Sequence, residues 1–340
     1  MENNRWIKRP EGSNWGDFGP DDQIGRLNFI TPDVVRLAAA EVREGLSFCL
    51  SLPLDFPGGN RLNARRHPPK FSPTMGEGVA YYNYQVAHTS PGHTDVISDD
   101  AVVLHTQYST QWDSFAHVGQ MFDANDDGFA ESVYYNGYRA GMHILSALDE
   151  TGRGMGAKKL GIETMAVKAI QSRGVLLDLF QLCGRDRYFV GYDDFMRAME
   201  MDKVEVCRGD ILCLYTGFGD LIMEMNGDPD AVKLHNSCAV LDGRDEHLLR
   251  WISDSGISAL VADNYAVEGL PANSGNLPCA SAPLHEHCLF KLGIPLGELW
   301  YLGDLARWLR SKARSRFMLT APPLRLTGAV GSPLTPVATV

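Results

Sequence analysis

The sequence predicts a mixed α/β fold, because helices repeatedly lead into short apolar strands. Residues 162–173 read as a helix, and the run 174–180 that follows is apolar on both faces, as in a buried strand. The same order recurs where a helix over 245–255 precedes a strand over 257–267. A layered arrangement of helices on a sheet is therefore expected.

Further segments fit this fold class. An N-cap, a proline at the first helical position and a glycine stop predict a helix over about 32–44. The apolar run 210–218 predicts another strand between the two helix–strand pairs. Runs rich in β-branched and aromatic residues at 81–86 and 101–110 indicate that the first third of the chain contains more strand.

Composition excludes several partners and compartments. The net charge of −11 disfavours nucleic acid and anionic membrane surfaces as partners, and no run approaches the roughly 18 apolar residues that span a bilayer. The seven cysteines are scattered without a C-x-x-C pair, which favours a reducing, cytoplasmic compartment. No repeat or charge block divides the sequence. One domain over residues 1–340 is expected, with an N-terminal arm of about 1–30 and a C-terminal tail of about 328–340.

The densest cluster of polar functional groups lies at residues 107–117. Its main members are separated by even numbers of residues and would share one face of a strand: Gln107, Gln111, Asp113 and His117. In a straight strand, Gln107 and Gln111 would lie roughly 13 Å apart, too far for ligands of one ion. The segment must therefore bend to form a metal site, and a polar strand and turn without catalytic role is an equally good interpretation of this cluster alone.

A second cluster lies near the C-terminus. Ser281 is predicted to cap a helix that has Pro283 in its first turn and ends at Gly293. His285 lies near the start of this helix. His287 points elsewhere on it and is predicted to be a surface or partly buried histidine.

The lengths of this helix and of the next segment bring two functional groups together. From His285 to Gly293 the helix rises about 12 Å. A strand that reverses over residues 294–298 would travel back about 13 Å. Glu298 is therefore expected beside His285, although such a pair taken alone is more often structural than catalytic.

The spacing Gln107-x3-Gln111-x-Asp113-x3-His117 resembles the signature of the cyclase-like metal-dependent hydrolase superfamily. Kynurenine formamidases and isatin hydrolases of that family carry H-x-G-T-H-x-D-x-x-x-H, so glutamine stands here at both leading histidines. Together with other segments, the motif resembles a longer branch of the family, to which trans-dienelactone hydrolase is similar. Those segments are Trp15-Gly16, 21–28, 174–178, 209–212, 262–264 with Glu268, 285–298 and 328–333.

The resemblance implies a swivelling β/β/α fold and a metal site. The metal ligands that it implies are Gln107, Gln111, Asp113, His117, His285 and Glu298. Because a glutamine amide oxygen is a weaker zinc ligand than imidazole, one divalent ion, Zn²⁺ or Mn²⁺, is expected.

The activity that follows is hydrolysis of a small cyclic ester (lactone) or amide by metal-activated water, with His117, His285 and Glu298 as catalytic residues. Candidate residues of the substrate pocket are Trp112, Phe115, Tyr134, Asp263 and Asn264. Two alternatives remain open: a lyase, dehydratase or cyclase reaction on the same scaffold, and a non-catalytic binding protein with a decayed site. The expected partners are a small-molecule substrate and further copies of the chain, in a homodimer or homotetramer.

Two other motifs have weaker interpretations. The run 61–67 carries three arginines and a histidine, which could meet an anionic substrate or a neighbouring subunit and otherwise form a solvated loop. Residues 123–128 match the first half of an EF-hand calcium loop, but Tyr134 stands where a bidentate glutamate is needed. A surface turn is predicted there.

Overall fold

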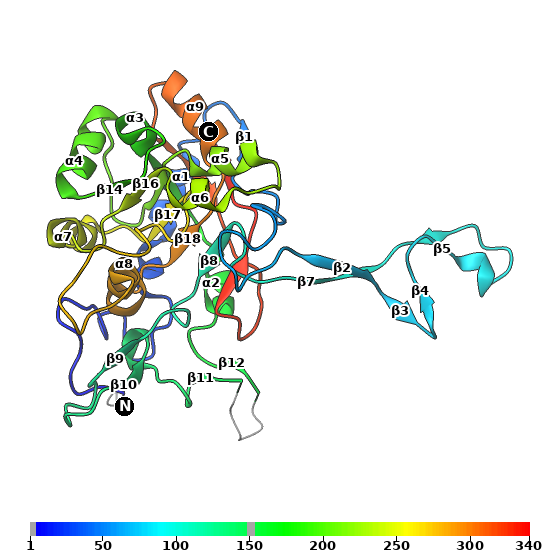
Figure 1. Ribbon diagram of the computed structural model, residues 1–340, viewed down its shortest axis with the longest axis horizontal. Coiled ribbons are helices and arrows are strands. Elements are labelled where there is room, and N and C mark those ends of the chain that lie inside the picture. The colour runs from blue at the N-terminus through cyan, green and yellow to red at the C-terminus, as the bar shows by residue number, and fades with distance from the viewer. Residues whose placement is uncertain (1–4, 148–153) are drawn as a thin grey trace.

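The computed structural model describes residues 5–147 and 154–340, and within them a nine-stranded mixed sheet forms the core (Figure 1). The central strands run parallel: β13 (Gln171–Asp178), β15 (Ile211–Tyr215), β17 (Ala259–Ala262) and β18 (Leu296–Glu298). Antiparallel strands extend both edges: β19 (Arg316–Thr320), β21 (Val337–Thr339) and β1 (Ser47–Cys49) beyond β13, and β8 (Gln111–Asp113) and β20 (Gly331–Pro333) beyond β18. The predicted mixed α/β class is confirmed.

Successive residues of the central strands point into two separate hydrophobic cores. In β15, Leu212 and Leu214 pack in one core, whereas Ile211, Cys213 and Tyr215 pack in the other. Because both faces of the sheet are covered, these strands are apolar at consecutive positions.

The helices of the described residues are α1 (Pro32–Ala39), α2 (Ile162–Lys168), α3 (Leu179–Cys183), α4 (Tyr192–Met201), α5 (Phe218–Met225), α6 (Ala231–His235), α7 (Glu246–Ser255), α8 (Pro283–His285) and α9 (Gly303–Ser311). Among the described residues, none of the helices combines the length and the apolar character that a membrane-spanning helix requires.

Two predicted helices are shorter in the structure than in the sequence pattern. Helix α1 ends at Ala39 rather than at residue 44. Helix α2 ends at Lys168 because Ala169 adopts a left-handed backbone, and residues 171–173 pair with β19 instead. Hydrogen bonds to a strand far away in sequence thus override the local helical pattern.

The other core elements lie where they were predicted. Helix α7 is capped by the Asp245 carboxylate, which accepts hydrogen bonds from the first turn, and it ends at Gly256, whose backbone is left-handed. The strands predicted over 210–218 and 257–267 are present as β15 and β17, each shorter than its apolar run. Residues at the ends of these runs continue the buried core without joining the ladder.

The first and the last segments that the structure describes are integrated into the body. Trp15 is fully buried, and its indole donates a hydrogen bond to the carbonyl of Phe290 at 2.7 Å. Residues 328–340, which were expected to form a C-terminal tail, supply β20 and β21, and these strands pair on opposite sides of the central sheet. Neighbouring strands satisfy its backbone groups, so it forms part of the core rather than a peripheral extension.

Much of the β structure in the first third lies outside the core, in a ribbon that projects from the body (Figure 1). The ribbon consists of β2 (Lys70–Pro73), β3 (Met75–Gly76), β4 (Val79–Ala80), β5 (Tyr84–Gln85), the 3₁₀ turn η2 (Val86–His88), β6 (Val96–Ile97) and β7 (Asp100–Val103). We refer to residues 70–103 as the arm. The remaining short elements are η1 (Gly25–Phe29), β9 (Gln120–Phe122), β10 (Glu131–Val133), η3 (Tyr135–Gly137), β11 (Ile144–Leu145), β12 (Gly156–Ala157), β14 (Tyr188–Val190) and β16 (Ala239–Leu241).

Helix α8 continues into a π-helix, η4 (Glu286–Leu292), which ends at Gly293 as predicted. Gly293 has a left-handed backbone with a φ of 56°. A Cβ atom there would lie 2.7 Å from the Tyr135 ring and 2.8 Å from the Cα atom of Gly25. Glycine at this position therefore allows both the turn from helix to β18 and the close approach of the N-terminal segment.

Replacing Gly293 by alanine is expected to lower the free energy of unfolding by about 3 kcal/mol or more, because a strained backbone and a steric clash add together. Gly128 is a matched control, since its φ is 87° and a Cβ atom added there would have no atom within 4 Å. Gly128→Ala should cost only about 1 kcal/mol. Urea denaturation of both variants checks this, and equal losses would contradict the close-approach argument.

Candidate metal centre

The polar segment 107–117 bends at both ends of strand β8, as a metal site requires. Turn hydrogen bonds join Tyr108 to His105 before the strand and His117 to Ser114 after it. Strand β8 itself pairs antiparallel with β18, and Gln111 lies directly opposite Glu298. The backbone ladder therefore holds the two predicted clusters next to each other.

The predicted return of Glu298 to His285 is confirmed. The Nε2 atom of His285 lies 3.2 Å from Glu298 Oε1, and both side chains are buried. Helix α8 and η4 lead away from this point and strand β18 leads back to it, as the matched lengths indicated. His287 points elsewhere, and its Nε2 lies 3.0 Å from the Ser253 hydroxyl.

Glu268, rather than Ser281, holds the start of helix α8. The N-cap is Ala282, which offers no side-chain acceptor. The Glu268 carboxylate instead accepts hydrogen bonds from the backbone N–H groups of Leu284 and His285, each at 3.0 Å, and from His285 Nδ1 at 2.7 Å. A carboxylate on one ring nitrogen fixes the ring's orientation and directs the other nitrogen into the site.

The residues at this point fit a divalent cation. Ligand atoms of Asp113, His285 and Glu298 all lie within 4.8 Å of one another, the one such His, Cys, Asp or Glu group within the described residues. Gln111 Oε1 and Asp113 Oδ2 are buried and lack a hydrogen-bond partner. Each unsatisfied buried polar atom costs about 1–3 kcal/mol, which a cation at the cluster would offset. One imidazole and two carboxylates suit Zn²⁺ or Mn²⁺.

The cluster is strongly coupled electrostatically. Burial, together with the nearby charge of Glu298, raises the pKa of Asp113 well above its ordinary value. Burial would lower the pKa of His285, but hydrogen bonds to Glu268 and Glu298 outweigh it and raise the pKa to about 10. Burial alone would raise the pKa of Glu298, but the hydrogen bond from His285 outweighs burial and lowers this pKa. His285 therefore retains a proton at neutral pH that a cation must displace, and the raised pKa of Asp113 favours its protonated form.

Gln111 presents its amide nitrogen to the carboxylates. Its Nε2 donates a hydrogen bond to Glu298 Oε2 at 2.9 Å and lies 3.4 Å from Asp113 Oδ1. The amide thus separates two carboxylates that would otherwise repel each other across the site. Its role as a metal ligand, inferred from the resemblance, stays a prediction.

His117 and Gln107 form the side of the cluster that faces solvent. The His117 side chain keeps 23 % of its surface exposed, and its Nε2 lies 3.9 Å from Asp113 Oδ1. The Gln107 amide Nε2 is 3.5 Å from His117 Nδ1, while its Oε1 accepts a hydrogen bond from Thr106. Burial lowers the pKa of His117 to about 4, so its ring is neutral at physiological pH. The direct contacts of Gln107 are therefore with His117 and Thr106, and its role as a ligand stays a prediction.

The predicted pocket residues have other roles in the structure. Trp112 points away from the cluster, and its indole donates to the carbonyl of Ala321 within the core. Phe115 is also buried in a core. Asp263 accepts hydrogen bonds from three backbone N–H groups at the start of α5. Asn264 donates a hydrogen bond to the Ala239 carbonyl.

Of the five predicted pocket residues, all of which the structure describes, only Tyr134 is half-buried, and the other four are buried. The Tyr134 ring lies beside Gly119. A small depression beside the cluster is lined instead by residues of the loop before β2 and of the segment before β8. Those that bear on the site are Arg66, Gln107 and Tyr108, and Tyr265, which follows β17, completes this part of the lining. The approach to the cluster thus differs from the aromatic pocket that the sequence suggested.

Two residues near the cluster were not predicted as part of the site. Glu268 appears in the sequence only as one residue of the family resemblance, more than a dozen residues before its partner His285. Arg66 belongs to the basic run 61–67, and its guanidinium donates to the carbonyl of Gln107 at 2.6 Å. Its positive charge opposes the rise in the pKa of Asp113. The three arginines of the run 61–67 were the sequence feature that could have identified Arg66 as a residue near the cluster.

Metal affinity is expected to rise with pH. The pKa of His285 is raised to about 10, so its ring binds a proton near neutral pH that Zn²⁺ or Mn²⁺ must displace, and the raised pKa of Asp113 acts in the same direction. For each displaced proton the apparent affinity should fall about tenfold per pH unit on acidification. Titration calorimetry in buffers of different ionisation enthalpy measures the protons released. A pH-independent affinity without proton release would refute this description of the cluster.

Glu268→Gln is expected to weaken metal binding about 10–100-fold, because the ring of His285 loses the carboxylate that orients it. Asp263→Asn removes another buried carboxylate, one that has no hydrogen bond to the cluster. That control should lower stability but leave metal affinity within about threefold. Competition with a chromogenic chelator gives both affinities, and equal weakening in the two variants would exclude a positioning role for Glu268.

Comparisons with known proteins identify the family and the fold of the chain. A family model described as putative cyclase matches residues 50–269. A crystal structure of a novel cyclase is 28 % identical, with 100 % of this chain and 99 % of that chain covered and a TM-score of 0.74. Isatin hydrolase A from Labrenzia aggregata is 13 % identical, with 89 % and 96 % covered and a TM-score of 0.54.

Isatin hydrolase A from Ralstonia solanacearum is 14 % identical, with 91 % and 98 % covered and a TM-score of 0.54. No curated protein sequence matches the chain. The family model covers well over half of the 340 residues, and the match to the novel cyclase spans the whole chain. The chain therefore belongs to the cyclase family, and it has the cyclase-like fold that the resemblance in its sequence implied.

Proposed function

We propose that this protein is a metal-dependent hydrolase that opens a small cyclic ester or amide. The observation that carries the proposal is the buried cluster of Asp113, His285 and Glu298, with His117 on its solvent side. A divalent cation bound there supplies a Lewis acid that polarises a carbonyl and lowers the pKa of water. The isatin hydrolases, which are similar in fold and have a named activity, act on a cyclic amide.

In this proposal His117 moves a proton or binds the reacting oxygen, which its partial exposure beside Asp113 supports. Its ring is neutral at physiological pH, and Gln107 Nε2 faces its Nδ1 atom. An amide N–H donated to Nδ1 favours the tautomer that carries its proton on Nε2. In that form His117 donates a hydrogen bond to a substrate oxygen beside Asp113 and can pass its proton to the group that leaves as the ring opens.

The charges around the cluster favour a neutral substrate that becomes an anion. Opening a lactone or a cyclic amide with water produces a carboxylate. Arg66 lies at the approach, where its guanidinium is held by the Gln107 carbonyl. A fixed positive charge at this place would stabilise the developing carboxylate more than the neutral substrate, which is the differential binding that lowers a barrier.

A second candidate function is a ring-closing or lyase reaction. It is favoured by the description of the family and by the novel cyclase, which is more similar in sequence than the isatin hydrolases are. Polarisation of a carbonyl would serve such a reaction equally well. The fate of water distinguishes the two, because hydrolysis inserts an oxygen atom from labelled water into the product and ring closure does not.

The test is an assay of metal-loaded protein on isatin, aromatic lactones and cyclic imides in labelled water. Ring opening with label incorporation is expected, and removal of the metal by chelation should abolish it. His117→Asn should lower kcat about a hundredfold or more without lowering metal content. His287→Asn is the matched control, since this histidine bonds Ser253 away from the cluster, and it should keep kcat. Full activity in chelator would overturn the proposal.

A further inference from the structure

Three buried residues beside the candidate metal centre have a left-handed backbone, which residues other than glycine rarely adopt. Ala266 and Val267, which precede Glu268, have φ values of 75° and 59°. Leu299, which follows Glu298, has a φ of 55°. Such conformations cost free energy and persist only where the surrounding contacts enforce them. Each carboxylate that bonds to the imidazole of the cluster is therefore attached to a strained segment.

Strand β16 holds the strained turn before Glu268. The backbone N–H of Glu268 donates a hydrogen bond to the carbonyl of Ala266 at 2.5 Å, which closes a γ-turn centred on Val267. A γ-turn whose central residue has a positive φ is rare and strained. On one side of Glu268, the Val267 carbonyl accepts a hydrogen bond from Leu241 of β16 at 3.1 Å. On the other side, the Gly269 N–H donates to the carbonyl of Leu241 at 3.0 Å. The place of Glu268 therefore follows the place of β16.

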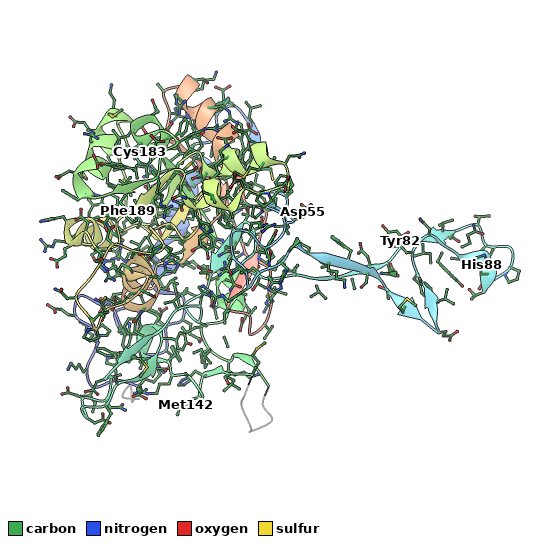
Figure 2. All side chains as sticks on the ribbon, in the orientation of Figure 1. Asp55, Tyr82, His88, Met142, Cys183 and Phe189 are labelled. Carbon is green, nitrogen blue, oxygen red and sulfur yellow. The ribbon has the colours of Figure 1, made fainter. Side chains whose placement is uncertain are left out.

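Strand β16 belongs to a small sheet of its own. Among the described residues, β14 and β16 pair in parallel as a two-stranded sheet, separate from the nine-stranded one. Figure 2 shows Phe189 of β14 on the side of the body opposite the arm. A Cβ atom added at Gly269 would lie 2.1 Å from the Phe189 ring, so the chain after Glu268 is packed tightly against the small sheet. Glu268 can meet His285 only if the small sheet is held in a fixed position relative to the nine-stranded sheet.

Asn264 connects the two sheets at this point. It lies two residues after the end of β17 and is buried. Its side-chain Nδ2 donates a hydrogen bond to the carbonyl of Ala239 in β16 at 2.9 Å and makes a longer contact of 3.4 Å with the carbonyl of Val267. Its main-chain carbonyl accepts a hydrogen bond from the N–H of Leu299 at 3.0 Å. One residue thus contacts both strained segments.

The other atom of the same amide is left without a partner. Asn264 Oδ1 is buried and forms no hydrogen bond within the described residues. Burial of an unsatisfied carbonyl oxygen costs free energy, and an apolar side chain of similar size would avoid that cost. The contacts of Nδ2 with β16 and with the strained turn are therefore the features that account for an amide at this position.

We propose that Asn264 is a positioning residue of the metal centre, which holds the strained turns beside Glu268 and Glu298 and so keeps both carboxylates on His285. Its side chain acts on Glu268 through β16 and Val267, whereas its main chain acts on Glu298. A residue of this kind touches no ligand atom, but it determines whether the imidazole is oriented before a cation binds. The inference rests on the metal centre proposed above and does not depend on which reaction the protein catalyses.

Competition for Zn²⁺ with a chromogenic chelator tests the effect on metal affinity. Asn264→Ala should weaken Zn²⁺ binding about tenfold, because the turn that carries Glu268 loses its support. Asn136→Ala is the matched control, since Asn136 is also buried and its amide donates to a backbone carbonyl, that of Asp22 in the N-terminal segment, at 3.0 Å. The control should keep its Zn²⁺ affinity within about threefold of the wild type. Equal weakening in the two variants would contradict the proposal.

A double variant distinguishes positioning from a general loss of stability. If the Asn264 side chain acts through Glu268, its removal has no further effect once the carboxylate is gone. The double variant Asn264→Ala, Glu268→Gln should therefore bind Zn²⁺ within about threefold of Glu268→Gln alone. Independent effects would instead multiply the two losses of affinity, and that result would overturn the proposal.

A second readout requires neither metal nor catalysis. In protein freed of metal by chelation, the proton between His285 Nδ1 and Glu268 is expected to give a strongly downfield NMR signal, because the hydrogen bond is short and charge-assisted. Its absence in His285→Gln assigns the signal. The signal should persist in Asn136→Ala and disappear in Asn264→Ala. Failure to detect it in the wild type, or its persistence in Asn264→Ala, would overturn the proposal whether or not the protein hydrolyses any substrate.

Circular dichroism shows whether each variant is folded. If Asn264→Ala does not fold, Asn264→Ser takes its place, because a hydroxyl retains one hydrogen-bond donor at this position. Asn264→Ser should lose less Zn²⁺ affinity than the tenfold expected for alanine, and its NMR signal should weaken. Wild-type affinity together with an unchanged signal would overturn the proposal for this variant as well.

Discussion

The position of His285 between two buried carboxylates is the constraint on which the rest of the site depends. Glu268 fixes the ring through Nδ1 and also holds the start of helix α8, so orientation of the imidazole and placement of the helix are one event. Glu298 meets the other nitrogen from strand β18. Strand β8 then adds Asp113 by pairing with β18. Loss of any one of these contacts would disturb both the local fold and the cluster.

The cluster places more negative charge inside the protein than its hydrogen bonds neutralise. Burying carboxylates close together is costly unless a cation or a proton compensates. Without a cation, the proton on His285 performs this role, the raised pKa of Asp113 favours its neutral form, and the Gln111 amide separates the acidic groups. The two acceptor atoms left without a partner show that the compensation is incomplete. A divalent cation would neutralise the excess negative charge and would coordinate the two acceptor atoms. The residues of the cluster therefore fit a divalent cation.

The local sequence pattern predicted the structure correctly wherever the interactions that stabilise an element are between residues close in sequence. The helix that begins at Pro283, its stop at Gly293 and the return of Glu298 follow from rise per residue and backbone preference. Pattern failed at residues 171–173, which look helical but pair with β19. It also failed at 328–340, where a segment without a strong strand pattern supplies two strands of the sheet. Pairing with distant strands decided both.

The sequence by itself determined the fold class, the family and most members of the cluster, because these depend on short-range periodicity and on a motif of fixed spacing. Only the tertiary structure decided which side chains surround the cluster. Trp112 alternates with Gln111 and Asp113 and so faces the core, whereas Glu268 and Arg66 arrive from remote loops. The sequence of the arm has the pattern of ordinary β structure. Its exposure became evident only in the structure, in which no other described element packs on it. Sequence spacing specifies which face a residue takes, but contacts between segments far apart depend on the complete packing of the chain.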